Sequence, residues 1–235
     1  QERFDEDALR ILRAVRFAAQ LDFEIEEQTR KAIQEQAELL QDISAERIQV
    51  EMTKLLMSKH PERLRIAYEL GVTAVVLPEF DRMMQTEQNN KHHMYSVGEH
   101  TLHVVEEVPA NKALRWAALL HDVAKPETKT TDENGDHFYG HNEKGVEIAR
   151  QILTRLKFDN ATIDRVKRLV FWHDYGMGQL MKLKTFRRGL SKMGADLFDD
   201  YVALKRADIL GQSDYMRQEK LDTLATLQSY YEQIM

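Results

Sequence analysis

The sequence predicts an all-α protein, and three observations carry this prediction. Helix-favouring residues (Ala, Leu, Glu, Gln, Lys and Arg) dominate a chain of 235 residues that has only four prolines and ten glycines. Apolar residues recur at helical spacing in most segments. A strand signal occurs in a single place, between Lys125 and His141.

The composition limits the class of protein further. Hydrophobic residues make up 43% and charged residues 31%, which indicates a soluble globular chain with one large or two small cores. No apolar stretch approaches the roughly 20 residues that span a bilayer, and no secretory signal is visible. Because the chain has no cysteine, we expect a cytoplasmic location. The net charge of −6 argues against a globally basic nucleic-acid-binding protein but permits local basic faces.

A first helix is expected over residues 5–21, with Asp5 as its N-cap. At about 100° per residue, one arc of this helix is apolar and the opposite arc is polar. The apolar arc holds Ala8, Ile11, Leu12, Val15, Ala18 and Ala19, and the polar arc holds Asp7, Arg10, Arg13 and Arg16. Since the chain starts at Gln1 and enters this helix almost at once, we expect it to be a piece of a longer protein.

Helices are also expected over residues 26–40 and 44–58. Pro61 suits the first turn of a further helix over 62–70, which Gly71 ends, and Pro78 closes a short segment over 72–77. The polar residues 82–94 are the candidate linker. These boundaries divide the chain into residues 1–81, residues 92–212 and a C-terminal helix over 213–235.

The second part is expected to be helical, with a small hairpin. Its helices are predicted over 97–107, 112–124, 144–156, 162–172, 185–193 and 196–210, with the last helix from about residue 214. Residues 128–131 and 137–139 flank Asn134-Gly135, the commonest short hairpin signal. We therefore expect a β-hairpin-like excursion near residues 126–140.

Histidines and aspartates are spread through these helices in an order that suggests a metal centre. The candidate ligands are His100, His121, Asp122, His141, His173 and Asp208. Imidazole and carboxylate ligands without cysteine are typical of a hydrolytic divalent-metal centre rather than a structural zinc site. Asp122 ends an apolar run, and a buried carboxylate without a cation costs roughly several kcal/mol.

Taken alone, each of these ligands also fits a simpler structural role that involves no metal. His100 fits a half-buried helix histidine that bonds a carbonyl, His173 fits an aromatic shell beside Trp172, and Asp208 fits a salt-bridge partner of Lys205 or Arg206. The joint pattern favours the metal. The histidines not expected to be ligands are His60, His92, His103 and His137, whereas His93 lies close to the site region.

This ordered set resembles the HD phosphohydrolase superfamily. The resemblance implies that His100, His121, Asp122 and Asp208 hold one divalent ion, and that His141 and His173 hold a second ion or contact phosphate. It also implies a catalytic set of His121, Asp122 and Lys125. Lys125 matches a lysine that steadies substrate phosphate, with a solvated lysine as the alternative. The ligand types do not select among Mn, Fe, Co, Ni, Zn and Mg.

Residues 3–21 (RFDEDALRILRAVRFAAQL) closely resemble the start of the neck in bacterial tRNA nucleotidyltransferases, the class II CCA-adding enzymes and their poly(A) polymerase relatives. Residues 43–51 (ISAERIQVE) resemble a further neck motif. Members often carry an HD domain after the neck, so the resemblance covers nearly the whole chain. It implies tRNA, CTP and ATP as partners of the full-length enzyme.

The same resemblance assigns the polar arc of the first helix to nucleotide binding. Asp7 and Arg10 match the pair that reads the incoming base, and Arg13 and Arg16 match nucleotide-contacting arginines. A carboxylate accepts hydrogen bonds and a guanidinium donates them, so the residue types suit this role. The alternative is an exposed helix face with an i,i+3 pair between Asp7 and Arg10.

The family's catalytic head carries a Gly-Ser motif and an Asp-x-Asp that binds Mg. This chain has no Gly-Ser dipeptide, and its Asp5-Glu6-Asp7 opens a helix, so we expect no nucleotide addition by this fragment alone. The expected activity is metal-dependent hydrolysis of phosphoesters, such as 2′,3′-cyclic or 2′-phosphates in some HD-bearing relatives. The sequence leaves the HD substrate, the number of metals and the oligomeric state open.

Two alternatives to this function remain. The first is a non-catalytic tRNA-binding body with a vestigial HD site. A local basic face supports it, made of Lys182, Lys184, Arg187, Arg188 and Lys192. The second is a stand-alone HD phosphodiesterase, which the first helix disfavours.

Overall fold

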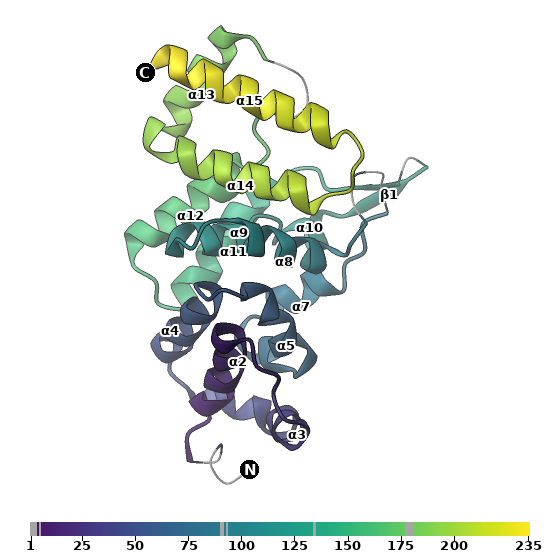
Figure 1. Ribbon diagram of the computed structural model, residues 1–235, viewed down its shortest axis with the longest axis vertical. Coiled ribbons are helices and arrows are strands. Elements are labelled where there is room, and N and C mark those ends of the chain that lie inside the picture. The colour runs from purple at the N-terminus through teal and green to yellow at the C-terminus, as the bar shows by residue number, and fades with distance from the viewer. Residues whose placement is uncertain (1–3, 5, 90–91, 93, 134, 177–180) are drawn as a thin grey trace.

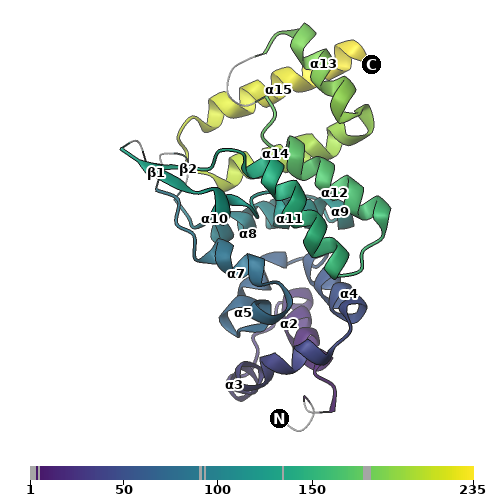
Figure 2. The same ribbon diagram turned by 180° about the vertical axis from the view of Figure 1, so that it is seen from behind.

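The fold is an elongated stack of helices with the two termini at opposite ends (Figures 1 and 2). The computed structural model describes residues 4, 6–89, 92, 94–133, 135–176 and 181–235. The predicted all-α class is confirmed, and the strands of this described part form one two-stranded sheet. Asp5, His93 and Asn134, to which the sequence assigned a cap, a nearby histidine and a turn, lie outside the described residues. No described helix is both long enough and apolar enough to cross a bilayer.

The N-terminal end is built on the first helix, whose apolar arc is buried as predicted. Ile11, Val15 and Ala19 have no exposed surface, because α2 packs against α4. The elements here are α2 (Leu9–Leu21), α3 (Glu27–Gln36), η1 (Ala37–Asp42), α4 (Ala45–Leu56), η2 (Pro61–Arg63), α5 (Leu64–Glu69), α6 (Val72–Val76) and α7 (Pro78–Met84).

Three predicted boundaries in this part are wrong. The helix expected from residue 5 begins at Leu9, whose N–H donates a hydrogen bond to Asp7 Oδ1 at 3.1 Å. The helix expected over 26–40 ends at Gln36 and tightens into the 3₁₀ turn η1. Pro78 opens α7 instead of closing the segment before it. Proline fits the first turn of a helix, because a backbone N–H at that position has no hydrogen-bond partner within the helix.

The candidate linker is therefore shorter and more structured than the sequence predicts. The first residues of 82–94 belong to α7, which ends at Met84. Gln88, in the irregular stretch that follows, is only 5% exposed. This stretch packs on the fold rather than bridging two separate bodies.

The C-terminal part holds the predicted hairpin and a series of longer helices. Thr130 pairs with His137 in the antiparallel register of β1 and β2. The elements are α8 (Val97–Glu107), α9 (Lys112–Leu120), α10 (Lys125–Thr128), β1 (Thr130–Asp132), β2 (Gly135–His137), α11 (His141–Arg155), α12 (Asn160–Trp172), α13 (Leu183–Met193), η3 (Ala195–Leu197), α14 (Phe198–Gly211) and α15 (Arg217–Ile234).

The helix predicted over 112–124 ends four residues early. α9 stops at Leu120, and a turn follows in which the Val123 N–H bonds the Leu120 carbonyl at 3.2 Å. Pro126 then stands in the first turn of α10, where it cannot donate a hydrogen bond to the preceding turn. His121 and Asp122 consequently lie in the turn between two helices.

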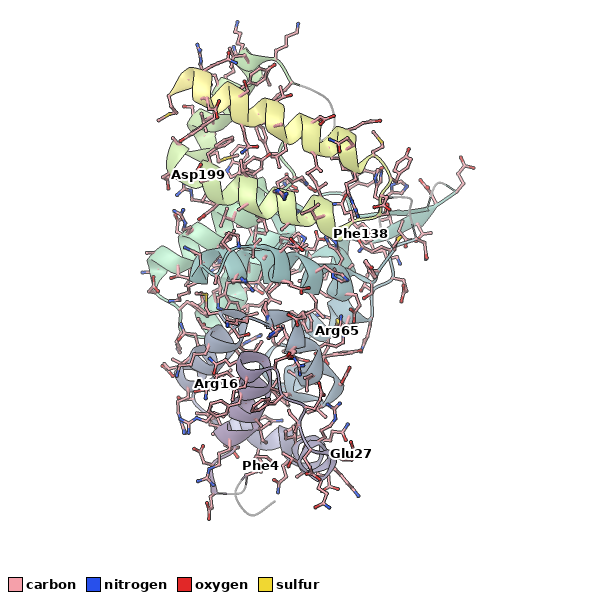
Figure 3. The ribbon with its side chains drawn as sticks, in the orientation of Figure 1. Phe4, Arg16, Glu27, Arg65, Phe138 and Asp199 are labelled. Atoms are coloured by element: carbon pink, nitrogen blue, oxygen red, sulfur yellow. The ribbon has the colours of Figure 1, made fainter. Side chains whose placement is uncertain are left out.

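One continuous core connects the two ends of the stack. Trp116 of α9 is fully buried and donates from Nε1 to Thr53 Oγ1 of α4 at 3.1 Å. Its neighbour Arg115 donates to the Leu56 carbonyl oxygen at 3.3 Å. Arg65, labelled in Figure 3, pairs with Glu99 at the start of α8. The junction between the two parts is therefore packed and hydrogen-bonded.

Candidate metal centre

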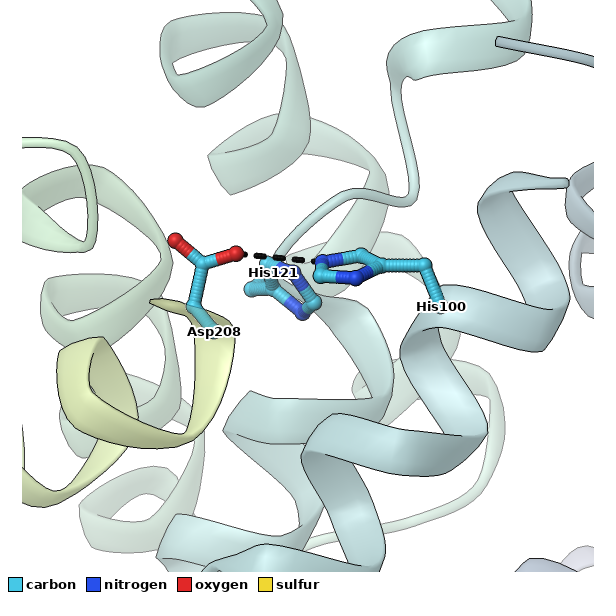
Figure 4. Close-up of side chains that lie close together, drawn as sticks. All are labelled: His100, His121 and Asp208. Carbon is cyan, nitrogen blue, oxygen red and sulfur yellow. Dashed lines mark hydrogen bonds and ion pairs between the residues drawn. The ribbon is translucent and has the colours of Figure 1, made fainter. Parts of the chain in front are cut away.

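Four helices and the turn after α9 bring the six candidate ligands together. His100 comes from the middle of α8, and His121 and Asp122 follow the end of α9. His141 opens α11, His173 follows α12, and Asp208 lies on α14. Figure 4 shows His100, His121 and Asp208 converging from three of these elements.

The first group of ligand atoms comes from His100, His121 and Asp208. His100 Nε2 lies 3.1 Å from Asp208 Oδ1, and the rings of His100 and His121 are 5.4 Å apart at their centroids. One atom from each residue lies within 4.8 Å of the others. Two ligands of one cation are at most about 4.4 Å apart, because each bond is about 2.0–2.2 Å long. The group needs at most a slight contraction to hold an ion.

Asp122, His141 and His173 form the second group, again within 4.8 Å. The Nε2 atoms of the two histidines are 3.1 Å apart, and Asp122 Oδ1 lies 3.5 Å and 3.7 Å from them. The other carboxylate oxygen of Asp122 faces the first group, 3.2 Å from His121 Nε2 and 3.7 Å from His100 Nε2. Asp122 is thus placed between the groups, with one oxygen toward each.

All four histidines turn the same edge of the ring toward this centre. Each Nδ1 lies against a backbone carbonyl oxygen, at 3.1 Å for His100, 2.7 Å for His121, 2.8 Å for His141 and 2.7 Å for His173. A carbonyl oxygen only accepts, so Nδ1 must carry the hydrogen and the lone pair of the neutral ring is on Nε2. Such second contacts are typical of metal-binding histidines.

Three of these Nε2 atoms, those of His121, His141 and His173, lie in contacts that neutral rings cannot satisfy among the described side chains. Those of His141 and His173 face each other, and two lone pairs cannot form a hydrogen bond. His121 Nε2 is buried and has no hydrogen bond of suitable geometry. A proton or a cation is therefore required between these nitrogens, and the ligand set fits a divalent ion.

The electrostatics of the centre favour a positive charge. Burial lowers the pKa of His121, but the Asp122 carboxylate outweighs burial and leaves this pKa raised. Burial also lowers the pKa of His141, but the carboxylates of Asp174 and Asp122 outweigh burial and leave this pKa raised. Burial raises the pKa of Asp122, yet the charges of His121 and Lys125 hold it well below its usual range. The negative potential of the carboxylates, which raises the pKa of His121 and His141, also attracts a metal cation.

Lys125 lies at the centre and not in solvent, since it is only 6% exposed. Its ammonium group is 2.7 Å from Asp122 Oδ2 and donates to Gln88 Oε1 at 3.0 Å. The alternative of a solvated lysine therefore fails. Its neighbour Phe138, labelled in Figure 3, lies with its ring centroid 5.2 Å from the ammonium nitrogen.

Asp174 and Lys205 belong to the centre and were missed by sequence reasoning. Asp174 Oδ2 is 3.2 Å from His141 Nε2, and the Lys205 ammonium lies 2.9 Å from Asp174 and 2.8 Å from Asp208. A signal for Asp174 was present, because His173-Asp174 is a second His-Asp dipeptide. The Lys205–Asp208 pair is the salt bridge considered above as the alternative to metal binding by Asp208. It forms inside the cluster of candidate ligands.

The residues predicted to form the polar arc of the first helix are occupied by contacts within the protein, although Asp7 lies before α2. Asp7 pairs through both carboxylate oxygens with Arg47 of α4, at 3.1 and 3.2 Å, rather than with Arg10 as the i,i+3 alternative requires. Arg10 pairs with Glu6 at 2.8 Å.

Further along the arc, Arg13 and Arg16 both face the buried Glu51, with Arg16 Nε 3.2 Å from its carboxylate. Figure 3 labels Arg16 on α2. Arg47, which pairs with Asp7, and Glu51, which faces Arg13 and Arg16, both lie in the segment 43–51.

Two protein families match this chain and divide it in a similar way. The HD domain family matches residues 91–211, which contain all six candidate ligands. The family described as the probable RNA and SrmB-binding site of polymerase A matches residues 22–84. The fold and site thus define an HD-domain protein with a helical RNA-binding region before that domain.

Curated relatives specify the family further. The chain is 33% identical to the multifunctional CCA protein of Actinobacillus pleuropneumoniae, over 92% of this chain and 57% of that protein. It is 35% identical to the CC-adding tRNA nucleotidyltransferase of Thermus thermophilus, over 89% of this chain and 50% of the relative. The A-adding enzyme of Deinococcus radiodurans is 34% identical, over 86% and 49%. The chain belongs to the tRNA nucleotidyltransferase family, and it spans about half the length of these relatives.

Proposed function

We propose that this chain serves a tRNA nucleotidyltransferase as its neck and HD domain, and that the HD centre hydrolyses phosphoesters with a divalent metal. The observation that carries the proposal is the convergence of four Nε2 atoms, each with its Nδ1 on a carbonyl, around the carboxylate of Asp122. The match to the HD family over residues 91–211 supports it.

The residues divide the work of the centre between them. His100, His121, Asp122 and Asp208 would hold one cation, and His141 and His173, with Asp122 beside them, would hold a second. A divalent ion supplies Lewis acidity toward a phosphoryl oxygen and acidifies a nearby water. Lys125 holds its ammonium group beside Asp122, where it can donate to a phosphate oxygen that enters the centre.

Substitution of Asp122 tests this proposal. We expect Asp122→Ala to lose metal and to abolish hydrolysis of 2′,3′-cyclic and 2′-phosphates, because both groups of ligands share this carboxylate. Metal content is measured on protein purified without chelator, beside phosphatase assays with Mn, Co, Ni, Zn and Mg. The matched control is Asp199→Ala, an exposed aspartate on α14. Unchanged metal content and turnover in Asp122→Ala would reject a metal-dependent centre.

For the neck, we propose that Asp7, Arg10, Arg13 and Arg16 contact the incoming CTP or ATP in the full-length enzyme, whose separate head uses Mg. The pair formed by Asp7 and Arg47 supports this, since a carboxylate held by both oxygens has a fixed orientation. Asp7→Ala and Arg10→Ala should each reduce discrimination of CTP and ATP against UTP and GTP by roughly one to two orders of magnitude. HD hydrolysis should be unaffected, and wild-type selectivity in both variants would make the arc structural.

A non-catalytic tRNA-binding body is the second candidate, and one observation favours it. Lys182, Lys184, Arg187, Arg188 and Lys192 of the α13 region are all exposed, and none has an ion pair among the described residues. Neutralising Arg187 and Arg188 should weaken tRNA binding and reduce its salt dependence by about one to two ion contacts. If tRNA binding falls while no metal-dependent hydrolysis is detected, this second candidate is correct.

A further inference from the structure

A third lysine stands beside the metal centre, on a helix outside the matched HD region. Lys220 lies on α15, beyond residue 211 where the HD match ends. Figure 1 shows α15 running alongside α14, the helix that carries Asp208. Arg217 at the start of α15 fixes the junction, because it donates to the Gln212 carbonyl oxygen at 2.8 Å and to the Leu210 carbonyl oxygen at 3.4 Å.

One glutamine amide connects Lys220 to the ligand cluster. The Lys220 ammonium donates to Gln212 Oε1 at 2.5 Å, and Gln212 Nε2 donates to Asp208 Oδ1 at 2.9 Å. On its other side the ammonium lies 3.1 Å from His92 Nδ1. The amide of one glutamine side chain therefore connects the Lys220 ammonium to Asp208, a proposed metal ligand.

Lys220 differs from the two other lysines of the centre in having no anionic partner in the part of the chain that the structure describes. Lys125 forms an ion pair with Asp122, and Lys205 forms ion pairs with Asp174 and Asp208. No described carboxylate lies within 4 Å of the Lys220 ammonium, and both of its hydrogen-bond partners are uncharged side chains. Burial lowers the pKa of Lys220, which means that keeping its ammonium charged and partly buried costs free energy.

We propose that Lys220 binds a phosphate group of the substrate, and that α15 thereby completes the HD centre. A partly buried ammonium that lacks a carboxylate is stabilised when a phosphate oxygen becomes its counterion. Gln212 and His92 orient the ammonium without neutralising it. The inference rests on the proposed hydrolysis for the identity of the substrate, but it concerns phosphate binding, which is measured separately.

The test is the binding of inorganic phosphate to the metal-loaded 235-residue chain. We expect Lys220→Ala to bind phosphate at least about tenfold more weakly, since a hydrogen bond to a charged group is lost, and Lys220→Arg to recover most of the affinity. The metal content of Lys220→Ala should equal that of the wild type. The matched control, Lys31→Ala, removes an exposed lysine of α3 and should change neither quantity.

Several outcomes would overturn the proposal. Equal phosphate affinity in wild type and Lys220→Ala would show that Lys220 binds no phosphate. A loss of metal in Lys220→Ala would show that Lys220 supports the fold of the centre instead. If phosphate binding depends on Lys220 while the wild type hydrolyses no phosphoester, the subsite stands and the proposed hydrolysis fails. If hydrolysis is present, Lys220→Ala should raise KM more than it lowers kcat.

Discussion

At the scale of single residues, Lys205 balances the negative charge on one side of the candidate metal centre. It is only 3% exposed, and its ammonium contacts both Asp174 and Asp208. Burial lowers the pKa of Lys205, but the two carboxylates outweigh burial and raise it. The two carboxylates therefore favour the charged ammonium, which lowers the cost of burying Asp208.

We predict that Lys205→Met destabilises the metal-free protein by about 3 kcal/mol or more, because Asp208 then stays buried beside Asp174 without a cation. A divalent metal should reduce this loss, since the ion supplies the missing positive charge. Urea unfolding with chelator and with Mn or Zn measures both values, and the exposed Lys192→Met is the control. A loss of the same size in both conditions would contradict the prediction.

At the scale of elements, α8 is placed by a close approach to α7. A Cβ built on Gly98 would lie 2.6 Å from Met84 Cα and N, which no real side chain tolerates. Gly98 is therefore required for the spacing of these helices, and two residues later the same helix presents His100 to the centre. Packing at this contact controls a ligand position.

Gly98→Ala should lower the free energy of unfolding by about 1–3 kcal/mol through overpacking, and should reduce metal content by moving His100. Thermal unfolding and metal analysis check both effects. The control is Gly145→Ala on α11, whose Cβ would meet the Val170 side chain at 3.1 Å, so a smaller effect is expected. Wild-type stability and metal content in Gly98→Ala would show that α7 can move away freely.

The hairpin is held to the body by the carboxylate of Asp136. Its Oδ2 accepts from the Asn89 N–H at 2.8 Å and pairs with Lys129, while its Oδ1 accepts from Thr131 at 2.6 Å. Burial raises the pKa of Asp136, but these donors outweigh it and lower the pKa to about 2. The same irregular stretch carries Gln88, the acceptor for Lys125, so the hairpin also supports the centre.

We predict that the stabilisation by Asp136 is lost in acid. Its pKa in the folded chain is below the ordinary 3.8, so the carboxylate stabilises the fold above about pH 4 and ceases to do so as the pH falls toward 2. The stability difference between wild type and Asp136→Asn, measured by urea unfolding, should therefore shrink over this range. A constant difference for Asp136→Asn over this range would refute the linkage.

At the scale of the whole molecule, the neck and the HD region share one hydrophobic core. Trp116 lies where they meet, with its ring 4.9 Å from Phe158 and its Nε1 bonded to Thr53. On the same junction, Arg155 of α11 makes two hydrogen bonds to Glu79 of α7, at 2.7 and 2.8 Å. Neither part can separate without exposing these groups.

The chain should consequently unfold in one cooperative transition. Far-UV circular dichroism and the fluorescence of Trp116 and Trp172 should give the same urea midpoint, because Trp116 reports the junction, Trp172 reports the HD region and the helices report the whole. Thr53→Val should lower stability by about 1–3 kcal/mol, since it leaves the Trp116 N–H buried without an acceptor. Two separate transitions would show that residues 1–81 and 92–212 fold independently.

Helical periodicity was sufficient for the class of fold and for most of the helices. The alternation of apolar and polar residues in α2 is local information, and it correctly predicted which arc is buried. Boundaries were less accurate where a residue has two possible roles. Pro78 was assigned to the end of one segment but opens the next helix, and the apolar run before His121 gives no sign that α9 stops at Leu120.

The six candidate ligands were selected by their residue types together with the resemblance of their order to the HD superfamily, because few side chains suit a divalent ion. Which oxygen of Asp122 faces which histidines, and which acids the arginines of α2 meet, depend on helix packing between distant segments. Asp174 and Lys205 entered the centre for the same reason, as did Lys220 at its edge. Periodicity describes one helix at a time, whereas the charge balance of a buried site is decided only when separate helices pack around it.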